Sequence, residues 1–126
     1  MKAYLDIAGA PARVGPYAPA VRSTSGLLFC AGQIALDPAT GKIVEGGVEA
    51  QAIRVCENLK LVLEGAGSGW NKVLMTTIFL TDIADTPVVN EIYGRYVSQD
   101  APPARQTVAV KALPREVSIE ISVIAE

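Results

Sequence analysis

The stretch GGVEAQAIRVCENLKLVLEGAG, residues 46–67, decides the fold. Its apolar residues recur at the spacing that places side chains on one face of a helix: Val48, Ala52, Val55, Cys56, Leu59, Val62, Leu63 and Ala66. The charged and polar residues that lie off this face are Arg54, Glu57, Asn58 and Glu64. Glycines stand at both ends of the stretch. It therefore predicts an amphipathic helix of about five turns.

Extended segments lie on both sides of this helix. Before it, residues 20–24 and 27–33 flank the turn signal Ser25-Gly26, which predicts a β-hairpin. After it, residues 73–81 are rich in β-branched and apolar side chains and predict a central strand.

A second helix and two further strands follow. Thr86 supplies an N-cap and Pro87 the first position of a helix that ends near Ser98. Residues 105–111 and 116–125 predict the last two strands, which a proline-containing turn joins.

The predicted order is therefore β-β-α-β-α-β-β, with a further short strand near residues 2–6, in a single domain spanning residues 1–126. Two helices on one face of a sheet make an α+β layered fold. They cover only one face, yet residues 27–31 and 73–80 are apolar on both. A partly apolar, uncovered sheet face usually meets another subunit. The sequence thus predicts a homo-oligomer whose sheets line a shared interior.

Composition excludes several classes of function. The 126 residues are 50% hydrophobic and 19% charged, with a net charge of −2 and no histidine. That balance argues against a strongly basic nucleic-acid binder. Without histidine there is no Ser-His-Asp or Cys-His catalytic group and no histidine-bound zinc. Acid–base chemistry therefore falls to carboxylates, tyrosine, lysine or bound water.

The two cysteines, Cys30 and Cys56, lack the spacing of a redox or metal motif and are interpreted as structural. Free thiols indicate a reducing compartment. The first residues do not resemble a signal peptide, and no apolar stretch is long enough to cross a membrane. The sequence therefore predicts a cytoplasmic protein that binds neither a membrane nor a nucleic acid.

Two charged residues are the strongest candidates for chemistry. Arg105 begins a strand after a rigid proline segment, and its guanidinium can bind a carboxylate through two parallel hydrogen bonds. Alternation along the strand predicts that Arg105 points away from the helices, on the same outward side as Glu120. Glu120 is the single charge within an apolar strand and needs a partner if buried. For both residues the alternative is a structural ion pair between subunits.

Two further candidates carry weaker signals. Tyr17 lies on a proline-braced loop and suits a pocket wall, although such a ring more often only packs. Asn90 lies on the second predicted helix, where it is either a surface residue or a hydrogen-bond donor to a ligand. Composition and spacing alone name no activity.

Several short runs together resemble the RidA (YjgF) family over nearly the whole chain. These runs are VGPY (14–17), CAGQI (30–34), DPATG (37–41), PARQTV (103–108), ALP (112–114) and VSIEI (117–121). The resemblance implies a chorismate-mutase-like α+β fold assembled as a homotrimer. The sheets would form an inner barrel, with ligand pockets in the clefts between subunits.

The resemblance also implies an enzyme. RidA proteins hydrolyse reactive enamines and imines such as 2-aminoacrylate, formed by pyridoxal-phosphate-dependent dehydratases, to 2-oxo acids and ammonia, with no metal or cofactor. By this resemblance Arg105 binds the substrate carboxylate and Glu120 positions the attacking water. The remaining site residues implied by the resemblance are Tyr17, Gly32, Asn90 and Thr107.

Two positions depart from the family pattern. Many relatives carry cysteine where this chain has Thr107, which keeps a hydroxyl but cannot act as a thiolate. Ala31 stands where relatives often carry a hydroxyl residue. These differences bear on the substrate range and on any thiol-based activity.

Three other functions compete with the leading one. The same pocket suits a non-catalytic binding module for 2-oxo acids, or a deaminase specialised for ring-derived enamines. Endoribonuclease activity is less favoured because the chain is acidic and lacks histidine.

Overall fold

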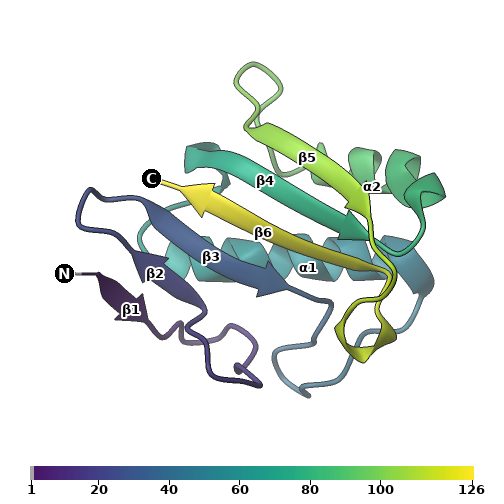
Figure 1. Cartoon of the computed structure of the whole chain (residues 1–126), viewed down its shortest axis with the longest axis horizontal. Helices are drawn as coiled ribbons and strands as arrows, with labels where there is room; N and C mark the ends of the chain where they lie inside the picture. Colours follow the sequence, from purple (N-terminus) through teal and green to yellow (C-terminus); the bar gives the residue numbers. More distant parts are fainter. Residues whose placement is uncertain (1) are drawn as a thin grey trace.

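A single mixed sheet with two helices on one face forms the structure, a computed structural model that describes residues 2–126 (Figure 1). The strands run in the order β1-β2-β3-β6-β4-β5, and among the described strands only the β4–β5 pair is parallel. The elements are β1 (Ala3–Leu5), β2 (Ala20–Arg22), β3 (Leu28–Gln33), α1 (Gly47–Gly65), β4 (Val73–Leu80), α2 (Thr86–Tyr93), β5 (Ala104–Ala109) and β6 (Ile119–Ala125). The predicted α+β class and element order are confirmed, including the short first strand.

Helix α1 packs its apolar face on β3 and β6 and also contacts α2. Its buried residues are Ala52, Val55, Cys56, Asn58, Leu59, Val62 and Leu63. The prediction that Asn58 lies off this face is therefore wrong, because its side chain is fully buried. The position follows Val55 by three residues and precedes Val62 by four, so it has the spacing of the apolar face.

Helix α2 is shorter than predicted and ends at Tyr93 rather than near Ser98. The chain then turns at Gly94, whose carbonyl accepts a hydrogen bond from Gln99 Nε2 at 2.9 Å. The N-cap of α2 is Asp85, one residue before the predicted Thr86. The Thr86 hydroxyl instead donates to the Ile83 carbonyl at 2.6 Å.

The last strand begins at Ile119, three residues after the predicted start at residue 116. A 3₁₀ turn, η3 (Pro114–Glu116), takes up these residues. Arg115 and Glu116 both have left-handed backbone angles, with φ of 55° and 57°. Such angles end an extended strand, so the β5–β6 connection bends sharply at Pro114.

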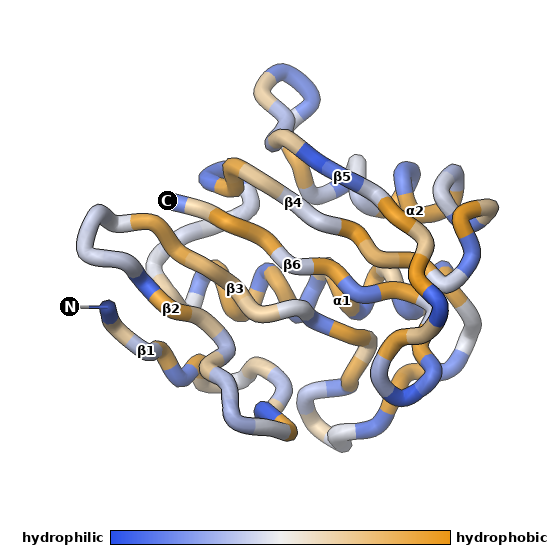
Figure 2. Tube along the Cα trace, viewed as in Figure 1, coloured by the Kyte–Doolittle hydropathy of each residue, from blue (hydrophilic) through white to orange (hydrophobic). Residues whose placement is uncertain are grey.

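The sheet face opposite the helices is open in the single chain and partly apolar, as the sequence predicts. Phe29, Leu74 and Val108 are 44%, 43% and 42% exposed. Figure 2 shows hydrophobic segments running along β3, β4 and β6. Among residues 2–126, no helix combines the length and the apolarity needed to cross a membrane.

Candidate functional site

An irregularity in the pairing of β3 with β6 lies at the floor of a pocket. Cys30 pairs with Val123 and Gln33 with Ile121, so Ala31 and Gly32 together face Ser122. This extra residue is a β-bulge, a device that redirects the chain and often borders functional sites. Here it moves the end of β3 toward the first residues of β6.

The bulge places Gly32 directly beside the Glu120 carboxyl group. A Cβ atom added to Gly32 would lie 2.5 Å from Glu120 Oε2 and 2.9 Å from its Cδ. Real Cβ atoms do not approach other atoms this closely, so any larger residue at position 32 displaces the carboxylate. Glycine at this position is therefore required for the observed placement of Glu120.

A pocket of about 290 Å³ opens above this contact. Its walls come from the N-terminal loop, from the end of β3 and from Pro114 in η3. The charged and polar side chains that line it are Arg13, Tyr17, Gln33 and Glu120. Tyr17, Gly32 and Glu120, three of the predicted site residues, thus share one pocket, and we call these three the pocket cluster.

Glu120 lies in this pocket as a half-buried carboxyl group. Burial removes water from it and raises the pKa of Glu120 above its ordinary value. Within residues 2–126, no cation lies within ion-pair distance of the carboxylate. A carboxyl group in such surroundings is suited to hold a water molecule by hydrogen bonds.

Arg105 lies elsewhere, on the helix side of the sheet. In the parallel β4–β5 pair, Arg105 stands beside Thr76 and Thr107 beside Ile78, and both β4 residues are fully buried under the helices. The prediction that Arg105 points away from the helices, on the side of Glu120, is therefore wrong. The apolar Val108 faces the open side instead, because that side is itself partly apolar.

Helix α2 positions the Arg105 side chain. Its Nη1 donates to Asn90 Oδ1 at 2.7 Å, and its guanidinium carbon lies 5.3 Å from the centre of the Tyr93 ring. Tyr93 is held in turn by a 3.0 Å hydrogen bond from its hydroxyl to Thr76 Oγ1. Arg105 remains exposed, so most of its donors face outward.

On the same side of β5, Thr107 carries a hydroxyl group that lacks a hydrogen-bond partner within residues 2–126. Its Oγ1 is buried and has no hydrogen-bond partner among the residues that the structure describes. A buried hydroxyl without a partner costs free energy, so this side of β5 has unmet hydrogen-bonding capacity beside Arg105. Asn90, Arg105 and Thr107 form what we call the edge cluster, since β5 is the edge strand of the sheet.

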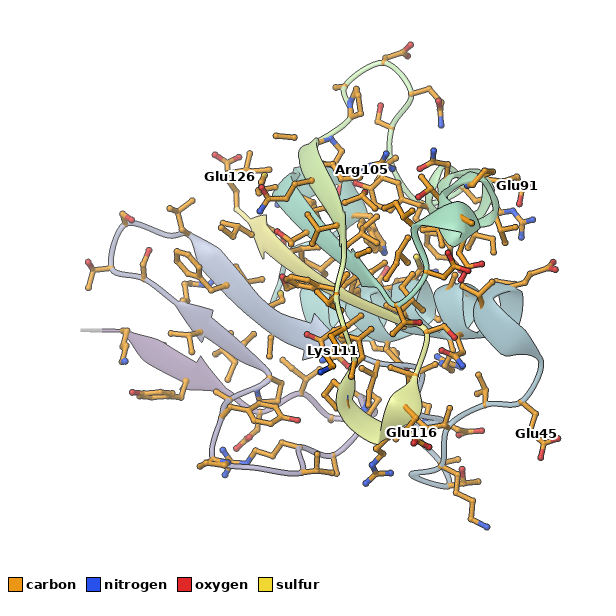
Figure 3. The ribbon with its side chains drawn as sticks, turned by 45° about the vertical axis from the view of Figure 1, so that its right-hand side comes forward. Glu45, Glu91, Arg105, Lys111, Glu116 and Glu126 are labelled. Carbon is orange, nitrogen blue, oxygen red and sulfur yellow. The ribbon has the colours of Figure 1, made fainter. Side chains whose placement is uncertain are left out.

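The single chain therefore divides the six predicted residues into two clusters. The pocket cluster opens on the uncovered side of the sheet, and the edge cluster lies on the helix side of β5. Figure 3 shows Arg105 near the start of β5, at the far end from the turn that carries Glu116. That turn contains Pro114, which lines the pocket. One chain does not bring Arg105 and Glu120 together.

Sequence reasoning missed one residue that shapes the pocket wall. The buried Asn58 amide donates to the carbonyls of Leu36 at 2.8 Å and Ile34 at 3.3 Å. Its Oδ1 accepts from Arg54 Nε at 3.0 Å. Ile34 and Leu36 both line the pocket, so Asn58 anchors that wall to α1. The sequence signal for Asn58 is its position, which has the spacing of the apolar face of α1.

The cysteines contribute no reactive group. Cys30 and Cys56 are free and buried, and desolvation raises the pKa of each thiol to about 12. Both remain protonated at neutral pH, as the structural interpretation requires. In the part of the chain described, no three side chains of His, Cys, Asp or Glu gather closely enough to bind a metal ion.

Comparison with known proteins gives consistent matches over almost the full length. The model of the family described as Endoribonuclease L-PSP matches residues 7–126. The 2-iminobutanoate/2-iminopropanoate deaminase of Mus musculus is 43% identical over 116 residues, which are 92% of this chain and 84% of the mouse protein.

Two solved structures superpose closely. A Rid-family protein of unknown function, YyfA from Yersinia pestis, is 41% identical with a TM-score of 0.94, over 99% of this chain and 98% of that one. TdcF of E. coli, solved with bound serine, is 33% identical with a TM-score of 0.88, over 98% and 97% of the two chains.

Proposed function

The chain belongs to the Endoribonuclease L-PSP family, which includes the RidA (YjgF) proteins, and from this premise we propose that it is a 2-iminobutanoate/2-iminopropanoate deaminase. It hydrolyses reactive imines and enamines of the 2-aminoacrylate type to 2-oxo acids and ammonia. The name of the mouse relative and the serine bound by TdcF both support a small substrate derived from an amino acid.

The contact between Gly32 and Glu120 is the observation that carries this proposal. A carboxylate held against a glycine in a largely apolar pocket is an arrangement for orienting a single water. An imine carbon is already electrophilic, so an oriented water suffices without a strong base. In this role Glu120 accepts a hydrogen bond from the water and directs its oxygen at the C=N carbon.

Arg105 is the proposed anchor for the substrate carboxylate. Its guanidinium is exposed and aimed by Asn90, and it offers the paired donors that a carboxylate accepts. The unpartnered Thr107 hydroxyl supplies a further hydrogen bond beside it. Tyr17, which belongs to the pocket cluster, forms part of the wall of the pocket that holds Glu120.

The two clusters act together if the site lies between subunits. We therefore infer a homotrimer with a chorismate-mutase-like barrel, in which the edge cluster of one subunit meets the pocket cluster of the next. Each subunit is one domain of residues 1–126. The exposed Phe29, Leu74 and Val108 support this assembly, because exposed apolar side chains gathered on a sheet face indicate an interaction surface.

The reaction is a hydrolysis and involves no change of oxidation state. The enamine tautomerises to the imine. The water oxygen then forms a bond to the C=N carbon as the C=N π bond breaks and nitrogen takes up one proton of the water. In the resulting carbinolamine the C–N bond breaks, the hydroxyl proton passes to the nitrogen, which leaves as ammonia, and the carbon becomes the carbonyl of the 2-oxo acid. We place this activity in the cytoplasm, where free buried thiols such as Cys30 and Cys56 persist.

The proposal is tested by coupling the protein to threonine dehydratase and following the decay of 2-iminobutanoate by its ultraviolet absorbance. The wild-type protein accelerates the decay. Arg105→Ala lowers kcat/KM by about 100-fold or more, because it removes the charged partner of the substrate carboxylate. Arg95→Ala is the matched control, since that guanidinium lies on the surface and pairs with Glu91 at 2.7 Å.

Two results contradict the proposal. One is a decay rate equal to that of the uncatalysed reaction. The other is equal acceleration by Arg105→Ala and wild type. Binding of 2-oxobutanoate without any acceleration establishes the binding-module alternative instead.

A further inference from the structure

Arg13 lines the pocket that holds Glu120, and the reaction above assigns it no role. Its Nη1 donates to the Tyr17 carbonyl at 3.0 Å, so the neighbouring loop holds the guanidinium at the pocket. This bond uses only one of the five N–H donors of the side chain.

The charge of Arg13 is not neutralised by the protein. Among residues 2–126, no carboxylate lies within ion-pair distance of Arg13, and that includes Glu120 in the same pocket. Most of the other pocket walls are apolar: Pro11, Ala12, Val14, Pro19, Ala31, Ile34, Leu36 and Pro114. Arg13 is exposed at the rim of this apolar pocket, so most of its donors remain free to bind an anion that enters.

A substrate with a single carboxylate leaves this cation unused. In the proposed mechanism Arg105 takes the carboxylate next to the C=N bond, and Glu120 holds the water. A side chain that ends in a second carboxylate would match Arg13, whose planar guanidinium can donate two parallel hydrogen bonds to it. The positive charge of Arg13 would also offset the repulsion between Glu120 and the second carboxylate of the substrate.

We propose that Arg13 makes this site selective for 2-iminodicarboxylates, such as 2-iminosuccinate, over imines with short apolar side chains. The inference rests on the proposed deaminase function and specifies its substrate class. It also implies a reaction class upstream, since such imines form when the α-amino group of an acidic amino acid is oxidised. Arg13 then acts as a specificity residue and takes no part in the hydrolytic step.

The test compares two substrates on the same variants. L-aspartate oxidase acting on aspartate supplies 2-iminosuccinate, and threonine dehydratase supplies 2-iminobutanoate. For Arg13→Gln we expect kcat/KM to fall about 10- to 100-fold with 2-iminosuccinate and less than about 3-fold with 2-iminobutanoate. Arg13→Lys keeps the charge and restores most of the lost rate. Lys60→Gln, an equal charge change on an exposed position of α1, leaves both rates unchanged.

Equal losses for the two substrates in Arg13→Gln overturn the inference, because Arg13 would then only brace the loop or anchor every substrate. A wild-type preference for 2-iminobutanoate overturns it as well. A change in oligomeric mass for Arg13→Gln, measured by light scattering, assigns Arg13 to a subunit contact and also overturns it.

Calorimetric titration with 2-oxoglutarate and 2-oxobutanoate separates this inference from the deaminase proposal. If no imine is hydrolysed, yet 2-oxoglutarate binds more tightly than 2-oxobutanoate and loses that advantage in Arg13→Gln, the selectivity stands and the deaminase function fails. If both imines are hydrolysed at equal rates and Arg13→Gln changes neither, the function stands and the selectivity fails.

Discussion

The pocket cluster and the edge cluster are built by different structural means. Arg105 and Thr107 of the edge cluster stand on a regular strand, where pairing with β4 sets which way each side chain points. Gly32 of the pocket cluster stands on a bulge, where regular alternation is broken. A regular strand therefore sets the direction of its side chains, whereas a bulge brings its backbone close to a neighbouring side chain. The proposed reaction needs both features: the oriented guanidinium of Arg105 and the Glu120 carboxylate in contact with the backbone of Gly32.

Mixing two inactive variants gives the largest expected effect and decides whether the clusters belong to one site. Arg105→Ala damages only the edge cluster, and Glu120→Gln damages only the pocket cluster. Unfolded together in equal amounts and refolded, they should recover about a quarter of wild-type activity, because a random trimer pairs an intact edge with an intact pocket in that fraction of its interfaces. The measurement is imine decay after refolding.

The control is each variant refolded alone, which stays at background. If the mixture also stays at background while it forms trimers of normal mass, the two clusters do not share a site between subunits.

Gly32→Ala changes only the close approach between the β3 backbone and the Glu120 carboxylate. The added Cβ would lie 2.5 Å from Glu120 Oε2, so the carboxylate must move. We expect kcat/KM to fall about 100-fold, the scale on which a misplaced catalytic group is felt. Steady-state kinetics on 2-iminobutanoate measures it.

A double-mutant cycle is the control for Gly32→Ala. In a Glu120→Ala background, the side chain that clashes is gone, and Gly32→Ala should have almost no further effect. A full additional loss there would show that the glycine acts through something other than Glu120.

Asn58→Ala tests whether the pocket wall depends on the anchor from α1. The change leaves the Leu36 carbonyl without its donor, whereas the Ile34 carbonyl keeps its 2.8 Å hydrogen bond from the Leu36 N–H, so the free energy of unfolding should fall by about 1–3 kcal/mol. Urea denaturation measures this loss. Asn71→Ala, at an exposed position, is the matched control, and an equal change in both variants would contradict the anchor role.

The smallest expected effect is on pH dependence. Burial raises the pKa of Glu120, so its ionised form is the costly one in the folded protein. The stabilisation from the protonated form is present at low pH and is lost as pH rises through the folded pKa. Glu120→Gln should therefore raise Tm at pH 7 and leave it nearly unchanged at pH 4. Calorimetry at the two pH values measures the difference.

Activity should show the opposite trend, because holding the water requires the ionised carboxylate. The acid limb of kcat/KM should have its midpoint above 4.5, the ordinary pKa of this group. A limb centred at or below 4.5 would contradict the assignment of Glu120 to the water.

The sequence supports the fold better than the site, and particular residues show why. Periodicity is local, so the apolar face of α1 and the order of strands can be predicted from spacing alone. Alternation along the strand correctly predicts that Arg105 and Thr107 face the opposite side of the sheet from Val108. It does not say which side the helices cover, and the apolar Val108 faces the uncovered side. That choice depends on the packing of the whole molecule.

Close contacts between distant segments are harder still to predict. The Gly32–Glu120 contact depends on a bulge that no composition signal marks. The family resemblance names the pocket residues, but it does not assign Arg13 a role. Its position at the pocket becomes visible only when the N-terminal loop is seen folded over β3.

The bulge at Ala31 and Gly32 has a consequence for how such a pocket can arise. It consists of one residue more on β3 than on β6, so a deletion of one residue would restore continuous pairing of the two strands. Substitutions alone can tune the walls of the pocket but cannot remove that extra residue. A one-residue deletion in β3 should therefore straighten the strand and draw Gly32 away from Glu120, whereas single substitutions leave the bulge in place.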